Sequence, residues 1–249
     1  MLIQSDYHIH AAFYRSKKPG DVPGPTALEQ LTAARCAGSV YVGILEHCNQ
    51  SPKHPFHFLE KLSQEYYSAT FQRENVFLGV ESDLAPDGSD HCGKSGREKL
   101  MLHYVIGSVH LSPSICPDVM EYINTEFKSI TNALKYNSNI DVVGHPFGEG
   151  IRWERNGSIP VWSWNIIPEK YLNEILRLAK ENGKALEINR CNFDDPVYRD
   201  FLKKIQNEKI LFEAGSDAHN TQAVENAAVR TAFLEEMGFA EEYHWKPFI

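Results

Sequence analysis

Histidines stand close to carboxylates, or to one another, at several places in the sequence. The groups with metal-binding chemistry are His8 with His10, Glu46 with His47, Glu81, His110, His145, and Asp217 with His219. Imidazole nitrogens and carboxylate oxygens are ligands that borderline and hard divalent metals take in proteins. In an extended segment His8 and His10 place both rings on one side, because side chains repeat with a period of two. This pair can chelate a metal, and the added carboxylates predict a cluster of metals rather than a single ion.

Each of these groups lies at or just after the end of a predicted strand. The expected strands are residues 3–8, 40–46, 76–81, 104–109, 140–144, 184–188 and 210–214, and the expected helices are residues 26–37, 58–73, 117–136, 168–182, 197–207 and 221–237. Such alternation is typical of βα units around a mainly parallel sheet. Periodicity alone does not choose between a barrel and a doubly wound sheet. In a parallel barrel, the carboxyl ends of the strands would bring these groups together on one face.

Length and composition restrict the class of protein. The chain has 249 residues, 42% of them hydrophobic, and a formal net charge of −8. Because α/β barrels run to about 250 residues as one unit, we expect a single domain over residues 1–249. The acidic balance repels a phosphate backbone, which makes polymeric nucleic acid an unfavourable partner. The sequence leaves the oligomeric state open.

The cell compartment is also indicated by the sequence. No apolar stretch reaches the roughly 20 residues that cross a membrane, and the first residues turn polar too early for a signal peptide. The five cysteines are scattered and form no C-x-x-C pair, which predicts free thiols. We therefore expect a cytoplasmic protein with no membrane partner.

Three long segments between predicted elements cover residues 11–25, 82–99 and 146–168. Long loops in a compact domain are usually functional, and each of these follows a predicted strand. In a barrel they would border the active site, so we expect substrate-facing lids. The third segment carries Trp153, Trp162 and Trp164, which we expect to anchor their own loop rather than cover a substrate.

Each candidate ligand also has a plainer explanation when taken alone. Asp217 suits the cap of a following helix. Glu81 suits a surface ion pair, and His145 suits a packed loop. The coincidence of such groups at the ends of six different strands favours a metal site over these separate explanations.

Six segments in chain order resemble the successive motifs of the PHP (polymerase and histidinol phosphatase) superfamily. They are DYHIH at 6–10, LEHCN at 45–49, GVESD at 79–83, GSVH at 107–110, VGHP at 143–146 and GSDAH at 215–219. The last three resemble the stand-alone histidinol-phosphatase branch. The resemblance covers nearly the whole chain, and it implies a distorted TIM-like (β/α)7 barrel with two or three divalent metals, commonly zinc, iron or manganese.

The resemblance also implies a set of ligands for each metal. His8, His10, Glu81 and Asp217 would hold the first metal, Glu81 would bridge to a second held by His110 and His145, and His47 and His219 would hold the third. Family members with a full third site offer a further His or Asp soon after the first pair. Here residues 11–18 read AAFYRSKK, and no carboxylate follows until Asp21. Glu46 stands where Asp is more usual. We therefore expect the third site to be the weakest.

Metals about 3.5–4 Å apart can make a shared water nucleophilic and clamp phosphoryl oxygens, which supports hydrolysis of a phosphate ester. With Asp217 in the catalytic set, His219 or His47 would donate a proton to the leaving group if the third metal is missing. Guanidinium groups suit a dianionic phosphate. The candidates are Arg15, Arg152, Arg155 and Arg190, with Arg190 favoured because it follows the strand at 184–188.

These observations predict a metal-dependent phosphomonoesterase acting on a small metabolite, and the resemblance implies L-histidinol phosphate as the favoured substrate. The remaining possibilities are a related enzyme acting on nucleotides, oligonucleotides or phosphotyrosine, an amidohydrolase-like hydrolase, and a non-catalytic metal-binding protein. Other conspicuous residues are expected to have no catalytic role, namely His54, His57, His91 with Cys92, and Cys48.

Overall fold

Eight short strands build one sheet in the computed structural model, which describes residues 1–11, 25–49, 56–68, 70–111, 118–189 and 192–247. They are β1 (Ser5–His10), β2 (Tyr41–Leu45), β3 (His47–Cys48), β4 (Val76–Asp83), β5 (Tyr104–Ser108), β6 (Val142–Val143), β7 (Ala185–Glu187) and β8 (Phe212–Glu213). The order is β1-β2-β4-β5-β6-β7-β8, β3 also pairs with β4, and every pairing is parallel. Because only Glu46 separates β2 from β3, the seven predicted strands are confirmed.

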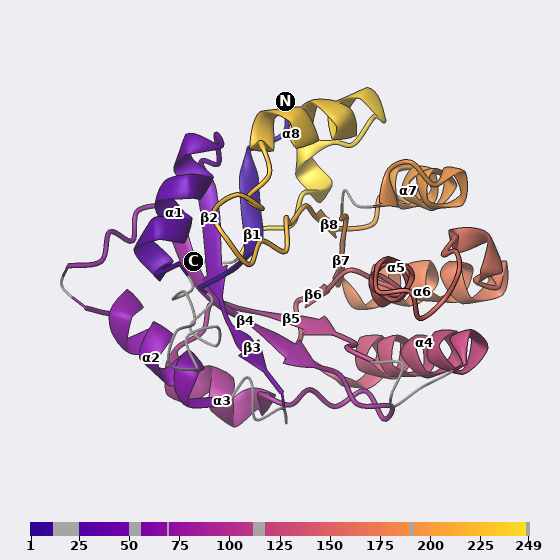
Figure 1. The fold of residues 1–249 in the computed structure, drawn as a ribbon, viewed down its shortest axis with the longest axis horizontal. Helices are drawn as coiled ribbons and strands as arrows, with labels where there is room; N and C mark the ends of the chain where they lie inside the picture. Colours follow the sequence, from indigo (N-terminus) through magenta and orange to yellow (C-terminus); the bar gives the residue numbers. More distant parts are fainter. Residues whose placement is uncertain (12–24, 50–55, 69, 112–117, 190–191, 248–249) are drawn as a thin grey trace.

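The sheet curls toward a barrel, with helices on its outer side (Figure 1). Its two edge strands are joined by residues beyond β8 rather than by a full ladder. Ile9 and Ala218 form an isolated parallel bridge, in which the His10 amide donates to the Ala218 carbonyl at 2.9 Å. At the other end, the Ser5 hydroxyl lies 3.0 Å from Nε2 of His244. The predicted distorted TIM-like barrel is therefore confirmed, and the β1–β8 seam is its irregular part.

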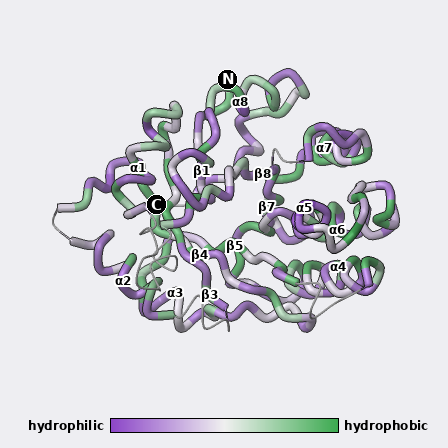
Figure 2. The backbone as a smooth tube through the Cα atoms, viewed as in Figure 1, coloured by the Kyte–Doolittle hydropathy of each residue, from purple (hydrophilic) through white to green (hydrophobic). Residues whose placement is uncertain are grey.

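The helices are α1 (Ala27–Cys36), α2 (Phe56–Tyr66), α3 (Gly93–Leu100), α4 (Val119–Tyr136), α5 (Glu149–Arg155), α6 (Glu169–Asn182), α7 (Pro196–Glu208) and α8 (Ala227–Glu236), with 3₁₀ turns η2 (Trp164–Ile166) and η4 (Glu241–Tyr243). Hydrophobic and hydrophilic residues alternate along them (Figure 2), as expected for helices with one buried face. Helix α6 buries Leu172, Ile175 and Leu176, and it ends at Gly183 in the left-handed conformation. No helix in the described residues is long and apolar enough to cross a membrane.

Two helices lie inside segments that the sequence predicts as loops. Helices α3 and α5 each contain glycine, which lowers intrinsic helix propensity and hides them from a pattern-based prediction. Packing explains Gly150 of α5, because a Cβ there would lie 2.1 Å from the ring of Trp162. Trp153, Trp162 and Trp164 are all buried, as expected for anchors of this segment.

Two helix boundaries also differ from the prediction. Helix α8 begins at Ala227 rather than at residue 221, because the side chain of Asn226 caps it by accepting from the Val229 amide. Helix α2 ends at Tyr66 rather than at residue 73.

Strand β1 carries a bulge just before the His-x-His pair. Its register against β2 shifts between Asp6 and Ile9, so that β1 has one residue more than its partner. As a result, the adjacent residues Tyr7 and His8 both turn toward the barrel interior. Tyr7 packs against the rings of Phe77 and Tyr104, while His8 lies among carboxylates contributed by other strands. Bulges commonly re-aim side chains beside active sites.

Aromatic side chains fill the barrel below the bulge. The ring of Tyr7 lies 5.9 Å from Phe77, 6.2 Å from Tyr104 and 5.8 Å from Trp245, each in an edge-on arrangement. The ring of Tyr104 passes over Gly79, where a Cβ would lie only 2.2 Å from it. We call Tyr7, Phe77, Tyr104 and Trp245 the aromatic layer.

Candidate metal centre

Glu81 lies at the centre of the predicted ligands. Its carboxylate faces five imidazoles, with Oε1 at 2.8 Å from His145 Nε2, 3.2 Å from His110 Nε2 and 3.5 Å from His8 Nε2, and Oε2 at 2.8 Å from His47 Nδ1 and 3.3 Å from His10 Nε2. Its side chain is 0% exposed. Because the two oxygens face different histidines, this carboxylate is placed to bridge two cations.

A first group of possible ligands combines β1 with the ends of β4 and β8. Single ligand atoms from His8, His10, Glu81 and Asp217 all lie within 4.8 Å of one another. Asp217 Oδ1 is 3.2 Å from His10 Nε2 and 3.5 Å from His8 Nε2. Asp217 adopts a positive φ of 51°, a strained conformation of the kind often kept at functional sites. This set of four is the one that the resemblance to the PHP superfamily implies for the first metal.

Two further groups share members with the first. One consists of His47, Glu81 and His110, and the other of His10, His47 and His219. His145, the other residue predicted for the second metal, lies beside Glu81 but is outside these compact groups. All eight predicted metal ligands are thus brought to one place, with His47 between the second and third sites.

In the third group, which consists of His10, His47 and His219, ring nitrogens of different histidines lie close together. Nδ1 of His219 lies 2.9 Å from the carbonyl oxygen of Asp217, which can only accept, so this nitrogen carries the proton. The lone pair of its Nε2 then faces Nε2 of His47 at 3.3 Å. The ring of His10 stacks on both, with centroid distances of 4.0 Å and 4.3 Å.

Two carboxylates that sequence reasoning missed orient the imidazoles. Asp83 Oδ1 is 2.7 Å from Nδ1 of His110, and Glu187 Oε1 is 2.9 Å from Nδ1 of His8. Such partners fix which ring nitrogen faces the metal. A signal for Glu187 existed, since it ends the one predicted strand to which no ligand was assigned.

His145 is held in an unusual backbone conformation. Its φ is 22°, and that of Phe147 is 58°. The Phe147 amide donates to Oε1 of Glu126 at 2.6 Å, and the His145 amide donates to Oε2 of Glu187 at 2.7 Å. Burial raises the pKa of the Glu126 carboxyl to about 7, although hydrogen bonds from Tyr122 and Phe147 act in the opposite direction. Buried carboxylates thus hold this strained turn at the end of β6.

The donor atoms of this cluster are better suited to binding divalent cations than to pairing with one another. Oε2 of Glu81 and Oδ1 of Asp217 are buried without a hydrogen-bond partner among the described residues. His8 Nδ1 faces a carboxylate and carries a proton, so its Nε2 directs a lone pair at those oxygens and at His10. Converging lone pairs repel one another unless a proton or a cation lies between them.

The pKa values of the histidines show this demand for positive charge. Burial alone would lower the pKa of His8, but Glu187, Glu81 and Asp217 outweigh it and raise that pKa well above its ordinary value. The pKa values of His10, His110 and His145 are raised by the same balance. Burial and the neighbouring His10 instead lower the pKa of His219 to about 3.

The predicted phosphate-binding arginines are only partly described. Arg152 and Arg155 lie on α5, which begins four residues after His145. Arg152 forms an ion pair with Glu149 at 2.7 Å, and its side chain is 57% exposed. Arg155 lines a pocket of about 450 Å³ together with Asn192 and other residues. Arg15, Arg190 and Asp21 lie outside the described residues, as does His54.

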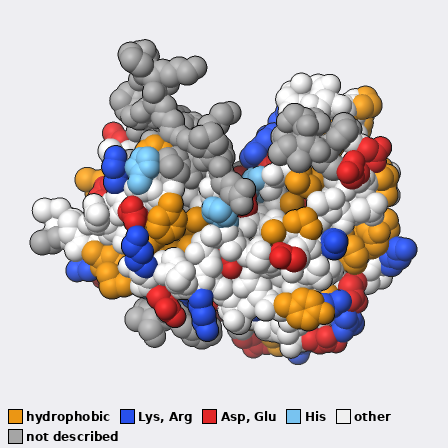
Figure 3. All heavy atoms as spheres, turned by 90° about the horizontal axis from the view of Figure 1, so that it is seen from below, with side chains coloured by type: hydrophobic (Ala, Val, Ile, Leu, Met, Phe, Trp, Pro, Cys, Tyr) orange, Lys and Arg blue, Asp and Glu red, His pale blue; other side chains and the backbone are white. Residues whose placement is uncertain are grey.

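Figure 3 shows histidine side chains exposed on one face of the molecule, near acidic and basic groups. His57 and His91 are exposed and belong to none of the three groups of possible ligands. Cys48 and Cys92 are buried free thiols.

The chain matches no protein-family model. It is 22% identical over 231 residues to the DNA polymerase/3'-5' exonuclease PolX of Bacillus subtilis, an alignment that covers 90% of this chain and 35% of PolX. It is 24% identical over 223 residues to a probable phosphatase of Caldanaerobacter subterraneus, covering 87% of this chain and 79% of that protein. The chain thus spans about a third of PolX but most of the second relative.

Solved structures share the fold at low sequence identity. A histidinol phosphate phosphatase from Lactococcus lactis, solved with zinc, L-histidinol and phosphate, superposes with a TM-score of 0.61 and 20% identity, covering 96% of this chain and 95% of that one. A protein of Listeria monocytogenes gives a TM-score of 0.60 and 14% identity, covering 88% and 97%. At these identities the likeness establishes the architecture alone.

Proposed function

We propose that this chain is a member of the PHP superfamily and that residues 1–249 form one metal-dependent phosphomonoesterase domain whose favoured substrate is L-histidinol phosphate. The observation that carries the proposal is the placement of Glu81, which faces five imidazoles beside Asp217 at the strand ends. A substrate of this kind would place the enzyme in histidine biosynthesis in the cytoplasm.

The chain offers ligands for two or three divalent metals, for which zinc, iron and manganese are suitable. We assign the first metal to His8, His10, Glu81 and Asp217, the second to Glu81, His110 and His145, and the third to His47 and His219. His10 stacks between the rings of the third pair and adds a nitrogen to it. The third site therefore has three nitrogens in the described residues, although residues 11–18 supply no further histidine.

Bound divalent metals would supply Lewis acidity toward the phosphoryl oxygens and a water of lowered pKa. The residues of the chain would fix where that charge lies. Glu81 keeps His145 beside one carboxylate oxygen and His10 beside the other. Asp217 places a second carboxylate next to His10. The lowered pKa of His219 keeps its ring neutral near pH 7, because burial and His10 oppose its charged form. This favours a ligand role for His219 over proton donation.

Arginines on the rim would orient the phosphate group. Arg152 and Arg155 extend from α5 beside the turn that carries His145. We keep both as phosphate ligands, together with Arg15 and Arg190, because guanidinium groups pair with phosphate through two hydrogen bonds. In this role Arg152 would exchange its ion pair with Glu149 for the substrate.

The test is a phosphatase assay on protein loaded with Mn²⁺ or Zn²⁺. We expect release of phosphate from L-histidinol phosphate at a higher kcat/KM than from an aryl phosphate, and loss of both activities in His10→Ala and Asp217→Ala. Equal turnover in the wild type and both variants would contradict the proposal. Metal content without turnover on any phosphate ester would support a non-catalytic protein instead.

A second candidate is a phosphodiesterase acting on nucleic acid, which is favoured by the alignment to PolX over 90% of this chain. The formal net charge of −8 opposes it. The same metal-loaded protein should be tested on a single-stranded oligonucleotide and on an aryl phosphodiester. Cleavage of the oligonucleotide at a higher kcat/KM than histidinol phosphate would replace the first proposal by this one.

A further inference from the structure

Glu187 contacts two predicted metal ligands from different strands. Its side chain is 0% exposed and lies at the end of β7. Oε1 accepts from Nδ1 of His8 at 2.9 Å, and Oε2 accepts from the backbone amide of His145 at 2.7 Å. His8 belongs to the proposed first metal and His145 to the second. One buried carboxylate therefore spans the two sites without belonging to either.

The neighbouring strands leave room for this side chain. A Cβ at Gly215 would lie 2.5 Å from Oε1 of Glu187 and 2.6 Å from Cβ of His8. A Cβ at Gly144 would lie 3.4 Å from Oε2, and only 2.1 Å from the Ser108 hydroxyl. Both glycines belong to the motifs that supply Asp217 and His145. The missing side chain of Gly215 thus allows the close approach of the carboxylate to His8, while Gly144 is needed for the approach of the Ser108 hydroxyl.

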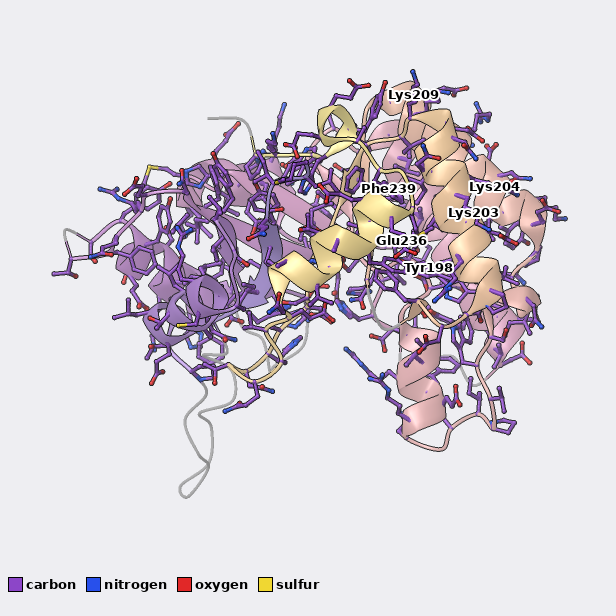
Figure 4. All side chains as sticks on the ribbon, turned by 90° about the horizontal axis from the view of Figure 1, so that it is seen from above. Tyr198, Lys203, Lys204, Lys209, Glu236 and Phe239 are labelled. Carbon is purple, nitrogen blue, oxygen red and sulfur yellow. The ribbon has the colours of Figure 1, made fainter. Side chains whose placement is uncertain are left out.

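The end of β7 is itself held from outside the barrel. The backbone amide of Asn189 donates to the hydroxyl of Tyr198 on α7 at 3.1 Å. Tyr198 is buried, and it lies nearer the centre of the molecule than Lys203 and Lys204 of the same helix (Figure 4). Glu187 therefore projects from a strand end whose position is fixed.

Only a carboxylate can make both contacts. Each of its oxygens accepts a hydrogen bond, whereas an amide has one accepting oxygen and a nitrogen that donates. With glutamine at this position, either His8 or the His145 amide would face another donor. Glu213, equally buried on the next strand, differs because it accepts from the Tyr7 amide and, among the described residues, forms no hydrogen bond or close ion pair with a predicted ligand.

We propose that Glu187 is a positioning residue that couples the two metals, by holding the His8 ring and the His145 backbone in one geometry. The inference rests on the metal assignment of the proposed function. The proton on Nδ1 of His8 leaves Nε2 as the coordinating atom. The bond to the His145 amide retains the backbone whose φ of 22° points that ring at Glu81. Loss of Glu187 would then weaken both metals together.

The test is a titration of metal-free protein with Zn²⁺, followed by calorimetry and by a competing chelator. We expect Glu187→Gln to weaken the first and second metals together by about 10- to 100-fold, the usual effect of removing a ligand's hydrogen-bond partner. Asp83→Asn, which affects only His110, should weaken the second metal alone. Glu213→Gln should retain wild-type affinity at both sites and is the matched control.

The outcomes separate this proposal from the proposed function. Wild-type affinity of Glu187→Gln at either site would overturn the coupling, while leaving phosphatase activity of the wild type intact as evidence for the function. A wild type that binds no metal would overturn both.

If Glu187→Gln does not fold, ¹⁵N spectra of the zinc-loaded wild type decide the question. The expected result is a proton on Nδ1 of His8 and a His145 amide protected from exchange. A deprotonated Nδ1 of His8 would contradict the proposal.

Discussion

The two ends of the barrel interior are built by the same strands but satisfy their polar groups differently. Strand β1 supplies Tyr7 to one end and His8 to the other, and β4 supplies Phe77 and Glu81. In the aromatic layer, the Tyr104 hydroxyl donates to the carbonyl oxygen of Tyr7. In the metal centre, buried oxygens of Glu81 and Asp217 have no hydrogen-bond partner among the described residues. No side-chain polar atom of the four aromatic-layer residues is among the buried unpaired atoms of the described residues, whereas the metal centre requires a proton or a cation between its ligands.

Positive φ angles occur at both ends but in different roles. Met101 and Lys209 end helices α3 and α7, and Asn75 precedes β4, whereas His145, Phe147 and Asp217 belong to the metal centre. Such strain costs of the order of 1–3 kcal/mol per residue and persists where the surroundings hold it. Here carboxylates do so, because Glu126 and Glu187 accept from amides of the strained turn. The stability of the rest of the barrel thus offsets the backbone strain that fixes the geometry of the site.

The largest expected effect comes from removing the central charge. We expect Glu81→Gln to abolish tight binding of divalent metal and to lower phosphatase kcat/KM by more than about 10³-fold. The reason is that metals supply several kcal/mol of stabilisation to the developing charge, and each 1.4 kcal/mol is tenfold in rate. Elemental analysis and steady-state kinetics measure both quantities.

Glu213→Gln is the paired control for that variant. Glu213 is also fully buried, and burial, followed by the charge of Glu187, raises the pKa of its carboxyl well above the ordinary range. Because Glu213 accepts from the Tyr7 amide and not from a metal ligand, metal content and kinetics should stay at the wild-type level. A Glu81→Gln protein that keeps its metals and turnover would show that the two buried carboxylates do not differ in function.

The aromatic layer should respond in the opposite way. Trp245 is 6% exposed and packs against the rings of Tyr7 and Tyr104. We expect Trp245→Ala to lower the free energy of unfolding by about 3–5 kcal/mol, the usual result for loss of a large buried ring. Thermal unfolding of metal-loaded protein measures it. Metal stoichiometry and kcat/KM, measured well below the unfolding midpoint, should be unchanged, and a matching loss of metal would refute the separation of the two ends.

The sequence predicted one end of the barrel much better than the other. The recurrence of histidine and carboxylate at strand ends is visible without coordinates, because the ends of parallel strands share one face. The aromatic layer was not predicted, since its members come from three strands and from Trp245 near the end of the chain. Their contact depends on strand register and on the bulge at β1, neither of which periodicity reveals.

Within the site, the limit of prediction lies between ligands and the groups that hold them. Ligands carry a recognisable residue type at a recognisable place. The role of Glu187 depends on the facing Gly215 and on the amide of His145, which donates to it. Those are properties of packing between neighbouring strands, so one strand's sequence does not contain them.

The smallest expected effect is a loss of stability of the metal-free protein as the pH rises, which bound divalent metal counteracts. In the metal-free protein the folded-state pKa of His8 lies above its ordinary value of 6.5, because Glu187, Glu81 and Asp217 outweigh burial. The same holds for His10, His110 and His145. A raised folded-state pKa contributes stability that is present below the unfolded value and is lost as the pH rises through the folded value. The lowered pKa of Asp217 changes stability only at acid pH, far from this range.

Divalent metals compete with these protons for the same nitrogen atoms, so the stabilisation they add should grow as the pH rises. We therefore expect the unfolding temperature of the metal-free protein to decrease as the pH rises above about 6.5. The increase in unfolding temperature that a fixed Zn²⁺ concentration produces should become larger over the same range. Trp245→Ala should shift both curves downward without changing their slopes, because the aromatic layer exchanges no protons with the metal centre. A metal-free midpoint that rises with pH would mean that the buried histidines are neutral in the absence of metal. The negative charge of Glu81 and Asp217 would then have to be balanced by some other positive charge.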